Sequence, residues 1–125
     1  MEEKKDSVIY TPAVFTDLRM GDLIVLNNGR KMPQIQLGTY RTRGADVAVA
    51  VTSALEAGYR AVDTAAVYRS HEQIADTLET ALPALGLTRE DIFITSKLAP
   101  RDHGTKLCRT VFQIPKILLE HLRYF

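Results

Sequence analysis

Residues 58–68, GYRAVDTAAVY, decide the fold of this chain. Gly58 is typical of a residue that ends a helix, because glycine adopts the left-handed conformation without a Cβ clash. Residues 59–62 predict a short buried strand, and the chain leaves that strand as a loop at Asp63. The stretch therefore places the Asp63 carboxyl group and the Tyr68 phenol just past the carboxyl end of a strand. In parallel α/β folds, this is the edge where loops converge on one mouth.

A second strand with a polar residue at its end follows downstream. Residues 91–96, DIFITS, predict this strand, and Lys97 stands at its carboxyl end. Taken singly, Tyr68 reads as a surface tyrosine, Lys97 as a solvated cation and Asp63 as a strand-end cap. Because neighbouring parallel strands end at the same rim, we expect these three side chains to lie close together.

The order of elements predicts an α/β fold. Both helices carry apolar residues at the spacing that makes one buried stripe, and the strands alternate with them. This alternation favours either a barrel or an open doubly wound sheet, with parallel strands. Residues 105–113 and 116–124 allow two further short helices. The predicted elements are a hairpin over 23–32, strands over 35–37, 59–62 and 92–96, and helices over 46–57 and 71–85.

Composition narrows the function classes. The 125 residues suit one small domain or part of a larger one, and a 46% hydrophobic share is enough for a packed core. A net charge of +1 gives no electrostatic case for nucleic acid or an anionic membrane as partner. No apolar run approaches the ~20 residues that span a bilayer. A single cysteine and an N-terminus that does not read as a signal peptide predict a reducing, cytoplasmic setting.

The three polar residues suit one reaction type. A phenol with a pKa of ~10 is a poor acid at neutral pH, and a nearby ammonium group favours its ionised form. Tyr68 beside Lys97 could then protonate a developing alkoxide, while Asp63 keeps Lys97 charged and oriented. The matching reduction of a carbonyl carbon needs hydride, which side chains do not supply, so a nicotinamide cofactor is implied. His71, His103 and Cys108 have no metal-ligand spacing, so we predict no metal site.

Four blocks of the chain resemble the aldo-keto reductase family. They occur in the family's order, and the gaps from Asp63 to Tyr68 and from Tyr68 to Lys97 are also the family's. The resemblance covers about residues 23–104 and implies the N-terminal part of a (β/α)8 TIM barrel, with the entry hairpin and about three βα units. The blocks are residues 26–33 (LNNGRKMP), 37–40 (LGTY), 58–65 (GYRAVDTA) and 89–98 (REDIFITSKL).

The resemblance implies an NADP(H)-dependent oxidoreductase that reduces small aldehydes or ketones to alcohols and catalyses the reverse oxidation. Tyr68 would be the general acid, Lys97 would make its phenol a stronger acid, and Asp63 would pair with Lys97. Gly38, Thr39 and Asp63 would lie beside the nicotinamide end of the cofactor, and Tyr40 and Val67 would line the substrate mouth.

The sequence also departs from the family. A full (β/α)8 barrel needs ~250 residues, and the resemblance ends near residue 104. The family's fourth catalytic residue, a histidine after the fourth strand, has no counterpart, since His103 and His121 have different flanks. Gln36 stands where a glycine is usual, and Ser70-His71 replaces Asn-Glu.

These departures leave two functions open. One is a truncated reductase with impaired activity. In that case the chain consists of an extension over 1–22, a partial reductase domain over 23–104 and a divergent tail over 105–125. The other is a non-catalytic partial barrel that acts, if at all, by association, because its last strand presents unpaired backbone groups at an open sheet edge.

Overall fold

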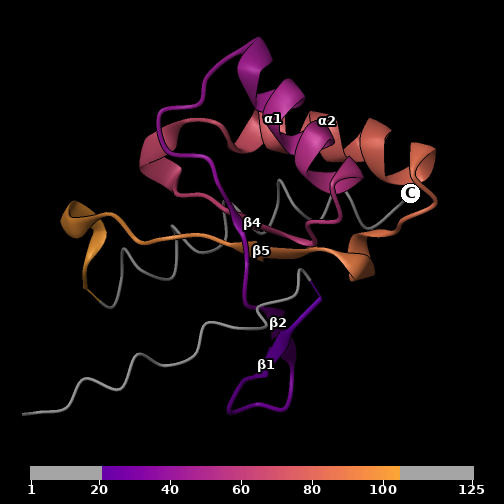
Figure 1. The fold of residues 1–125 in the computed structure, drawn as a ribbon. Coiled ribbons are helices and arrows are strands. Elements are labelled where there is room, and N and C mark those ends of the chain that lie inside the picture. Colours follow the sequence, from indigo (N-terminus) through magenta and orange to yellow (C-terminus); the bar gives the residue numbers. More distant parts are fainter. Residues whose placement is uncertain (1–20, 105–125) are drawn as a thin grey trace, which may run out of the picture.

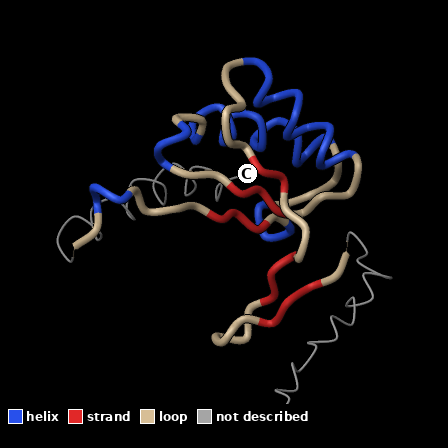
Figure 2. Tube along the Cα trace, turned by 60° about the vertical axis from the view of Figure 1, so that its left-hand side comes forward, coloured by secondary structure: helices blue, strands red, loops and turns tan. Residues whose placement is uncertain are grey.

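The computed structural model describes residues 21–104, which form a hairpin and a three-stranded sheet. In the hairpin, β1 (Leu23–Val25) pairs antiparallel with β2 (Lys31–Pro33). Gly29 makes the turn with a φ of +79°, a conformation that glycine adopts at little cost. The predicted hairpin is confirmed, except that Pro33 lies within β2. Figure 2 shows the hairpin set apart from the other strands.

The second sheet is parallel, with the strand order β3 (Leu37–Gly38), β4 (Ala61–Asp63), β5 (Phe93–Thr95). Its register aligns Gly38, Asp63 and Thr95 across the three strands. The connections are α1 (Ala45–Glu56) and α2 (His71–Ala84), which lie side by side over one face of this sheet (Figure 1). The predicted βαβαβ order is thus confirmed.

The core lies between this sheet and the two helices. Val62 and Ile94 point from the sheet toward the helices, and fully burying an aliphatic side chain stabilises a fold by ~1.5–3 kcal/mol. Leu85, the last residue of the predicted second helix and expected on its buried stripe, is instead 38% exposed because it lies past the end of α2. The buried cluster consists of Val47, Val51, Leu55, Val62, Ile74, Leu78, Ala81, Leu82 and Ile92.

The strands are shorter than the sequence predicts, for a physical reason at β4. The N–H group of Tyr59 donates to the Ala54 carbonyl oxygen at 2.9 Å, so it finishes α1 rather than pairing in a strand. Gly58, with a φ of +97°, makes the turn that allows this bond. Arg60 then donates to the Leu55 and Tyr59 carbonyl oxygens. The sheet therefore begins at Ala61 instead of residue 59.

The helices agree with their predicted bounds to within one residue. Pro83, expected to break the last turn of the second helix, lies inside α2, which ends one residue later. Short 3-10 turns occur at Ala66–Tyr68, Arg89–Asp91 and Pro100–Asp102. None of the helices over 21–104 is long and apolar enough to cross a membrane. Residues 1–20 of the predicted extension over 1–22, and the helices allowed within 105–124, lie outside the described residues.

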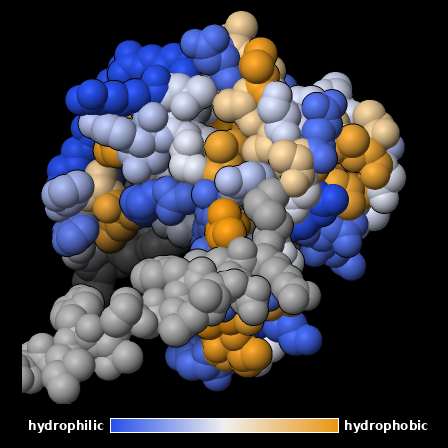
Figure 3. Space-filling view, in the orientation of Figure 1, coloured by the Kyte–Doolittle hydropathy of each residue, from blue (hydrophilic) through white to orange (hydrophobic). Residues whose placement is uncertain are grey.

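The hairpin carries exposed apolar side chains. All three residues of β1 are exposed: Leu23 at 50%, Ile24 at 42% and Val25 at 64%. In the space-filling view of Figure 3, an orange apolar patch lies on the hairpin, apart from the helices. Among the described residues, the hairpin therefore buries little of its own apolar surface.

Candidate active site

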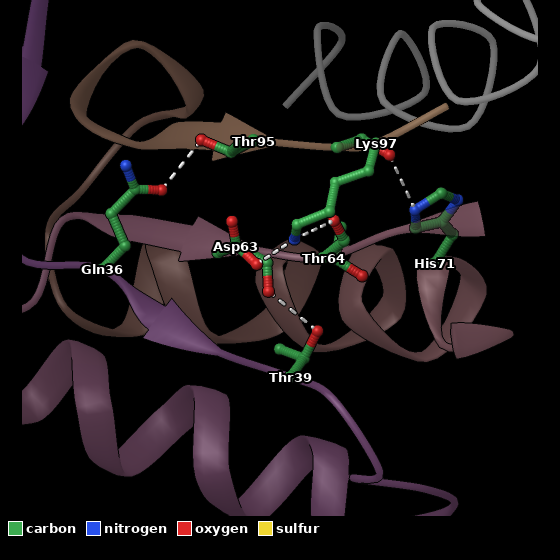
Figure 4. A network of polar contacts seen from close by, with 8 residues as sticks. Gln36, Thr39, Asp63, Thr64, His71, Thr95 and Lys97 are labelled. Carbon is green, nitrogen blue, oxygen red and sulfur yellow. Dashed lines mark hydrogen bonds and ion pairs between the residues drawn. The ribbon is translucent and has the colours of Figure 1, made fainter. Parts of the chain in front are cut away.

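Asp63 and Lys97 form an ion pair at the carboxyl end of the parallel sheet. Asp63 is the last residue of β4, and Lys97 follows β5 by two residues. The Lys97 Nζ donates a hydrogen bond to Asp63 Oδ1, and it also donates to the Thr64 carbonyl oxygen at 3.1 Å (Figure 4). The two side chains are 45% and 33% exposed, so the pair is open to solvent on one side.

Tyr68 joins this pair from the 3-10 turn that follows β4. Its ring centre lies 5.1 Å from the Nζ atom of Lys97, within the ~6 Å range of a cation–π contact. The structure thus brings together the three residues that the sequence predicts as a site. They come from a strand end, a turn and a second strand end.

The charge state of Lys97 is fixed by these neighbours. Burial alone lowers the pKa of Lys97, but hydrogen bonds to the Asp63 carboxylate and the Tyr68 phenol raise it, and so does the charge of Asp63. The net effect is a pKa above the ordinary value of 10.5. Lys97 is therefore a cation at neutral pH and keeps a positive charge against the phenol ring.

A second tyrosine extends the site toward solvent. Tyr40 follows β3, and its ring centre lies 5.2 Å from that of Tyr68 with a tilt of 57°. Tyr40 is 63% exposed and Val67, beside Tyr68, is 51% exposed. Both predicted mouth residues are therefore exposed, and Tyr40 lies next to the Tyr68 ring.

The residues between β3 and this mouth are arranged around Asp63. Thr39 is buried, and both its N–H group and its hydroxyl donate to the Asp63 carbonyl oxygen at 3.0 Å. Gly38 is exposed, and a Cβ atom built on it would meet nothing within 4 Å. The backbone of Gly38 is thus open to a flat ligand beside the Asp63 carboxylate, so these residues fit the nicotinamide end of a cofactor.

An arginine in the left-handed conformation follows each of the two tyrosines. Arg41 has a φ of 64° and Arg69 a φ of 56°, and they are the only described non-glycine residues with positive φ. The guanidinium carbon of Arg41 lies 5.2 Å from the Tyr40 ring centre. Left-handed backbone costs a non-glycine residue roughly 1–2 kcal/mol, and such strain is often found at functional sites.

Two contacts near the ion pair were missed by the sequence analysis. Ser96 Oγ lies 3.3 Å from His71 Nε2, and the Thr95 hydroxyl donates to Gln36 Oε1 at 2.8 Å (Figure 4). From the sequence, Gln36 was noted only as a departure from the family pattern, and His71 as such a departure and as a rejected metal ligand. No local pattern links them to partners that are 59 and 25 residues away in the sequence.

Comparison with known proteins decides the family. The profile described as "Aldo/keto reductase family" matches residues 34–124, which is more than half of the chain. The chain belongs to the aldo-keto reductase family. This match begins later than residue 23 and extends past residue 104, where the sequence analysis ended the resemblance.

Individual aldo-keto reductases support the same placement. An aldose reductase structure from Schistosoma japonicum is 42% identical with a TM-score of 0.73, over 79% of this chain and 33% of that one. The NADP(+)-dependent glycerol 2-dehydrogenase of Saccharomyces cerevisiae is 41% identical over 81 residues, or 65% of this chain and 25% of that protein. A D/L-glyceraldehyde reductase of Hypocrea jecorina is 43% identical over 84 residues, 66% and 25% of the two chains.

These identities and coverages define the fold and how much of it the chain spans. The structural relatives are (β/α)8 barrels, and the described residues correspond to an N-terminal part of that barrel. The chain spans about a quarter to a third of the relatives it matches. The predicted family and fold class are therefore confirmed.

Proposed function

We propose that this site serves the NADP(H)-dependent reduction of small aldehydes or ketones to alcohols. The observation that carries the proposal is the contact of Lys97 with both the Asp63 carboxylate and the Tyr68 ring at the carboxyl end of a parallel sheet. Such an arrangement suits proton transfer to a carbonyl oxygen, because a phenol beside a fixed cation can release its proton more easily.

The roles of the side chains follow from their contacts. Tyr68 donates its phenolic proton to the carbonyl oxygen of the substrate as that oxygen gains negative charge. Lys97 stabilises the phenolate left behind, since its ammonium group lies against the same ring. Asp63 acts as a positioning residue: it pairs with Lys97 and favours the charged form of the amine. NADPH, when bound, supplies the hydride for the carbonyl carbon.

The cofactor would be held by Gly38, Thr39 and Asp63. Gly38 offers open backbone, and Thr39 ties its own segment to Asp63 through two hydrogen bonds. NADP(H) is supported as the cofactor by the similarity to the NADP(+)-dependent glycerol 2-dehydrogenase of yeast. Tyr40 and Val67 would contact the substrate, which we take to be a small carbonyl compound by analogy with the glyceraldehyde reductase. We place this chemistry in the cytoplasm, where a single cysteine stays reduced.

The 125-residue chain alone is expected to be an impaired catalyst. The cofactor residues that we propose would all lie at the nicotinamide end, and we assign none of the described residues to the phosphate groups of NADPH. We keep residues 23–104 as the partial reductase domain, flanked by an extension over 1–22 and a tail over 105–125. The family match extends to residue 124 and so includes most of this tail.

A second candidate function is association without catalysis. The observation that favours it is the exposure of every side chain in β1, together with a parallel sheet whose outer strands, β3 and β5, each have one neighbour among the described strands. Strand edges of this kind pair readily with another chain. Sedimentation at several concentrations tests it: a monomer throughout excludes self-association.

The proposed reaction is tested with purified full chain, NADPH and D/L-glyceraldehyde, by following NADPH absorbance. We expect slow consumption that falls by about 100-fold or more in Tyr68→Phe, the usual size of a general-acid contribution. Tyr59→Phe is the matched control, since Tyr59 lies outside the site. Equal rates for the wild-type chain and Tyr68→Phe, with both folded, would remove the catalytic assignment.

A further inference from the structure

The segment that carries Tyr68 is tied at both ends to one dipeptide, Ser96-Lys97. At its start, Lys97 Nζ pairs with Asp63 and donates to the Thr64 carbonyl oxygen at 3.1 Å. At its end, Ser96 Oγ lies 3.3 Å from His71 Nε2. His71 is the first residue of α2, so this second contact joins the end of β5 to the start of that helix. Figure 4 shows the two contacts on either side of Thr64.

This double attachment fixes where Lys97 can lie. The ion pair alone sets the position of one flexible ammonium group, since a lysine side chain has four rotatable bonds. The Ser96–His71 contact instead holds the backbone from which that side chain starts. The backbone of β5 is itself held as far as Thr95, whose carbonyl oxygen accepts from the Thr64 N–H group at 2.8 Å. The Ser96–His71 contact extends this attachment to the residue directly before Lys97.

We propose that His71 is a positioning residue for Lys97: through Ser96, it holds the Lys97 backbone close to the turn that carries Tyr68. The catalytic meaning of this role rests on the proposed function, whereas the placement of Lys97 does not. His71 itself touches neither substrate nor cofactor in this proposal.

The environment of His71 suits a neutral ring. Its side chain is partly buried, and burial lowers the pKa of His71 below 6.5. The start of a helix also disfavours a positive charge. The charged residues nearest in sequence to the contact are Lys97 after Ser96, Arg69 in the Tyr68 turn and Glu72 on α2. Protonation of His71 would thus add a positive charge to a ring that contacts the residue directly before Lys97, so the Lys97 side chain should sense it in acid.

The test follows the Lys97 side chain by NMR in the isotope-labelled full chain, without cofactor or substrate. In the wild-type chain, we expect the Lys97 Cε signal to shift as His71 titrates, with the same midpoint as the His71 ring signals. His71→Ala should remove this coupled shift and bring the pKa of Lys97 down toward 10.5. Ser96→Ala removes the same contact from the other partner and should have the same effect. It keeps the test available if His71→Ala does not fold.

Two further variants separate positioning from a general loss of structure. His71→Gln keeps a hydrogen-bonding group without titrating, so it should retain the high pKa of Lys97 and lose only the acid shift. His103→Ala removes an exposed histidine elsewhere in the chain, so it should keep both the high pKa of Lys97 and the acid shift of its signal. A Lys97 signal that titrates alike in the wild-type chain, His71→Ala and Ser96→Ala would overturn the inference. Because no step uses NADPH, a lack of reductase activity would count against the proposed function alone.

Discussion

The ammonium group of Lys97 lies against the ring of Tyr68, with Nζ 5.1 Å from the ring centre, and the same ammonium group pairs with Asp63. One cation thus serves two partners that leave the sheet from the same strand, five residues apart. The contacts of this cation, rather than the placement of the phenol by itself, make the site chemically specific.

Replacing Asp63 with Asn should lower the pKa of Lys97, because the hydrogen bond and the charge of the carboxylate help to raise it. A group with a raised folded-state pKa stabilises the fold fully below its unfolded pKa and loses that effect as the pH rises through the folded value. The wild-type chain should therefore lose stability above pH 10.5 more steeply than Asp63→Asn does. Urea unfolding at pH 9 and above pH 11 measures this; parallel pH dependences would contradict it.

Core packing can be tested with two valines on one helix. Val51 is fully buried on α1 and Val49 is 65% exposed on the same helix. Removing two buried methyl groups in Val51→Ala should lower the free energy of unfolding by about 2 kcal/mol. Val49→Ala should change it by less than about 0.5 kcal/mol. Equal effects in urea titrations would mean that the helix packs by another face.

Binding of NADPH by the isolated chain should be weak. The proposed contacts, Gly38, Thr39 and Asp63, reach only the nicotinamide end of the cofactor, and charged phosphate groups usually need several donors. A fluorescence titration of the chain with NADPH should show no saturation in the micromolar range. Saturable micromolar binding would show that further residues of the chain hold the phosphates.

The left-handed backbone at Arg69 predicts an unusual response to substitution. Glycine adopts this conformation without the steric cost that arginine bears, so Arg69→Gly should raise the free energy of unfolding by up to about 1 kcal/mol. Arg69→Val should lower it, since a β-branched side chain is poorly suited to positive φ. Thermal and urea unfolding of the two variants measure the difference, and a valine variant as stable as the wild-type chain would contradict it.

The fold was predictable where one local signal decided each element. Gly58 marked the end of α1, the apolar stripe of α1 marked its buried face, and the run of residues 91–96 marked β5. The start of β4 was not predictable to the residue. It depends on the Tyr59 N–H group bonding to the last turn of α1, which is a question of helix capping and not of strand propensity.

The site was predictable in part for a related reason. Asp63 and Lys97 follow strands that run parallel, so the topology itself brings them to one edge. The contacts of His71 with Ser96 and of Gln36 with Thr95 depend on which way side chains turn once the sheet has formed. Residue type does not determine that direction, and neither contact lies within a single element.

The bond between Thr95 and Gln36 bears on how this sheet meets water. Val62 and Ile94 face the helices, and side chains alternate along a strand, so Thr95 and Ala61 face the other way. Gln36 directly precedes Leu37, which pairs with Val62 on β4, and its side-chain oxygen reaches Thr95 on β5 at 2.8 Å. On the side of the sheet away from α1 and α2, the strands are therefore bridged by an amide and a hydroxyl, groups that remain satisfied when wet. A three-stranded sheet with this polar bridge can tolerate solvent on that side. A wholly apolar side would instead have required further strands to close the sheet into a barrel.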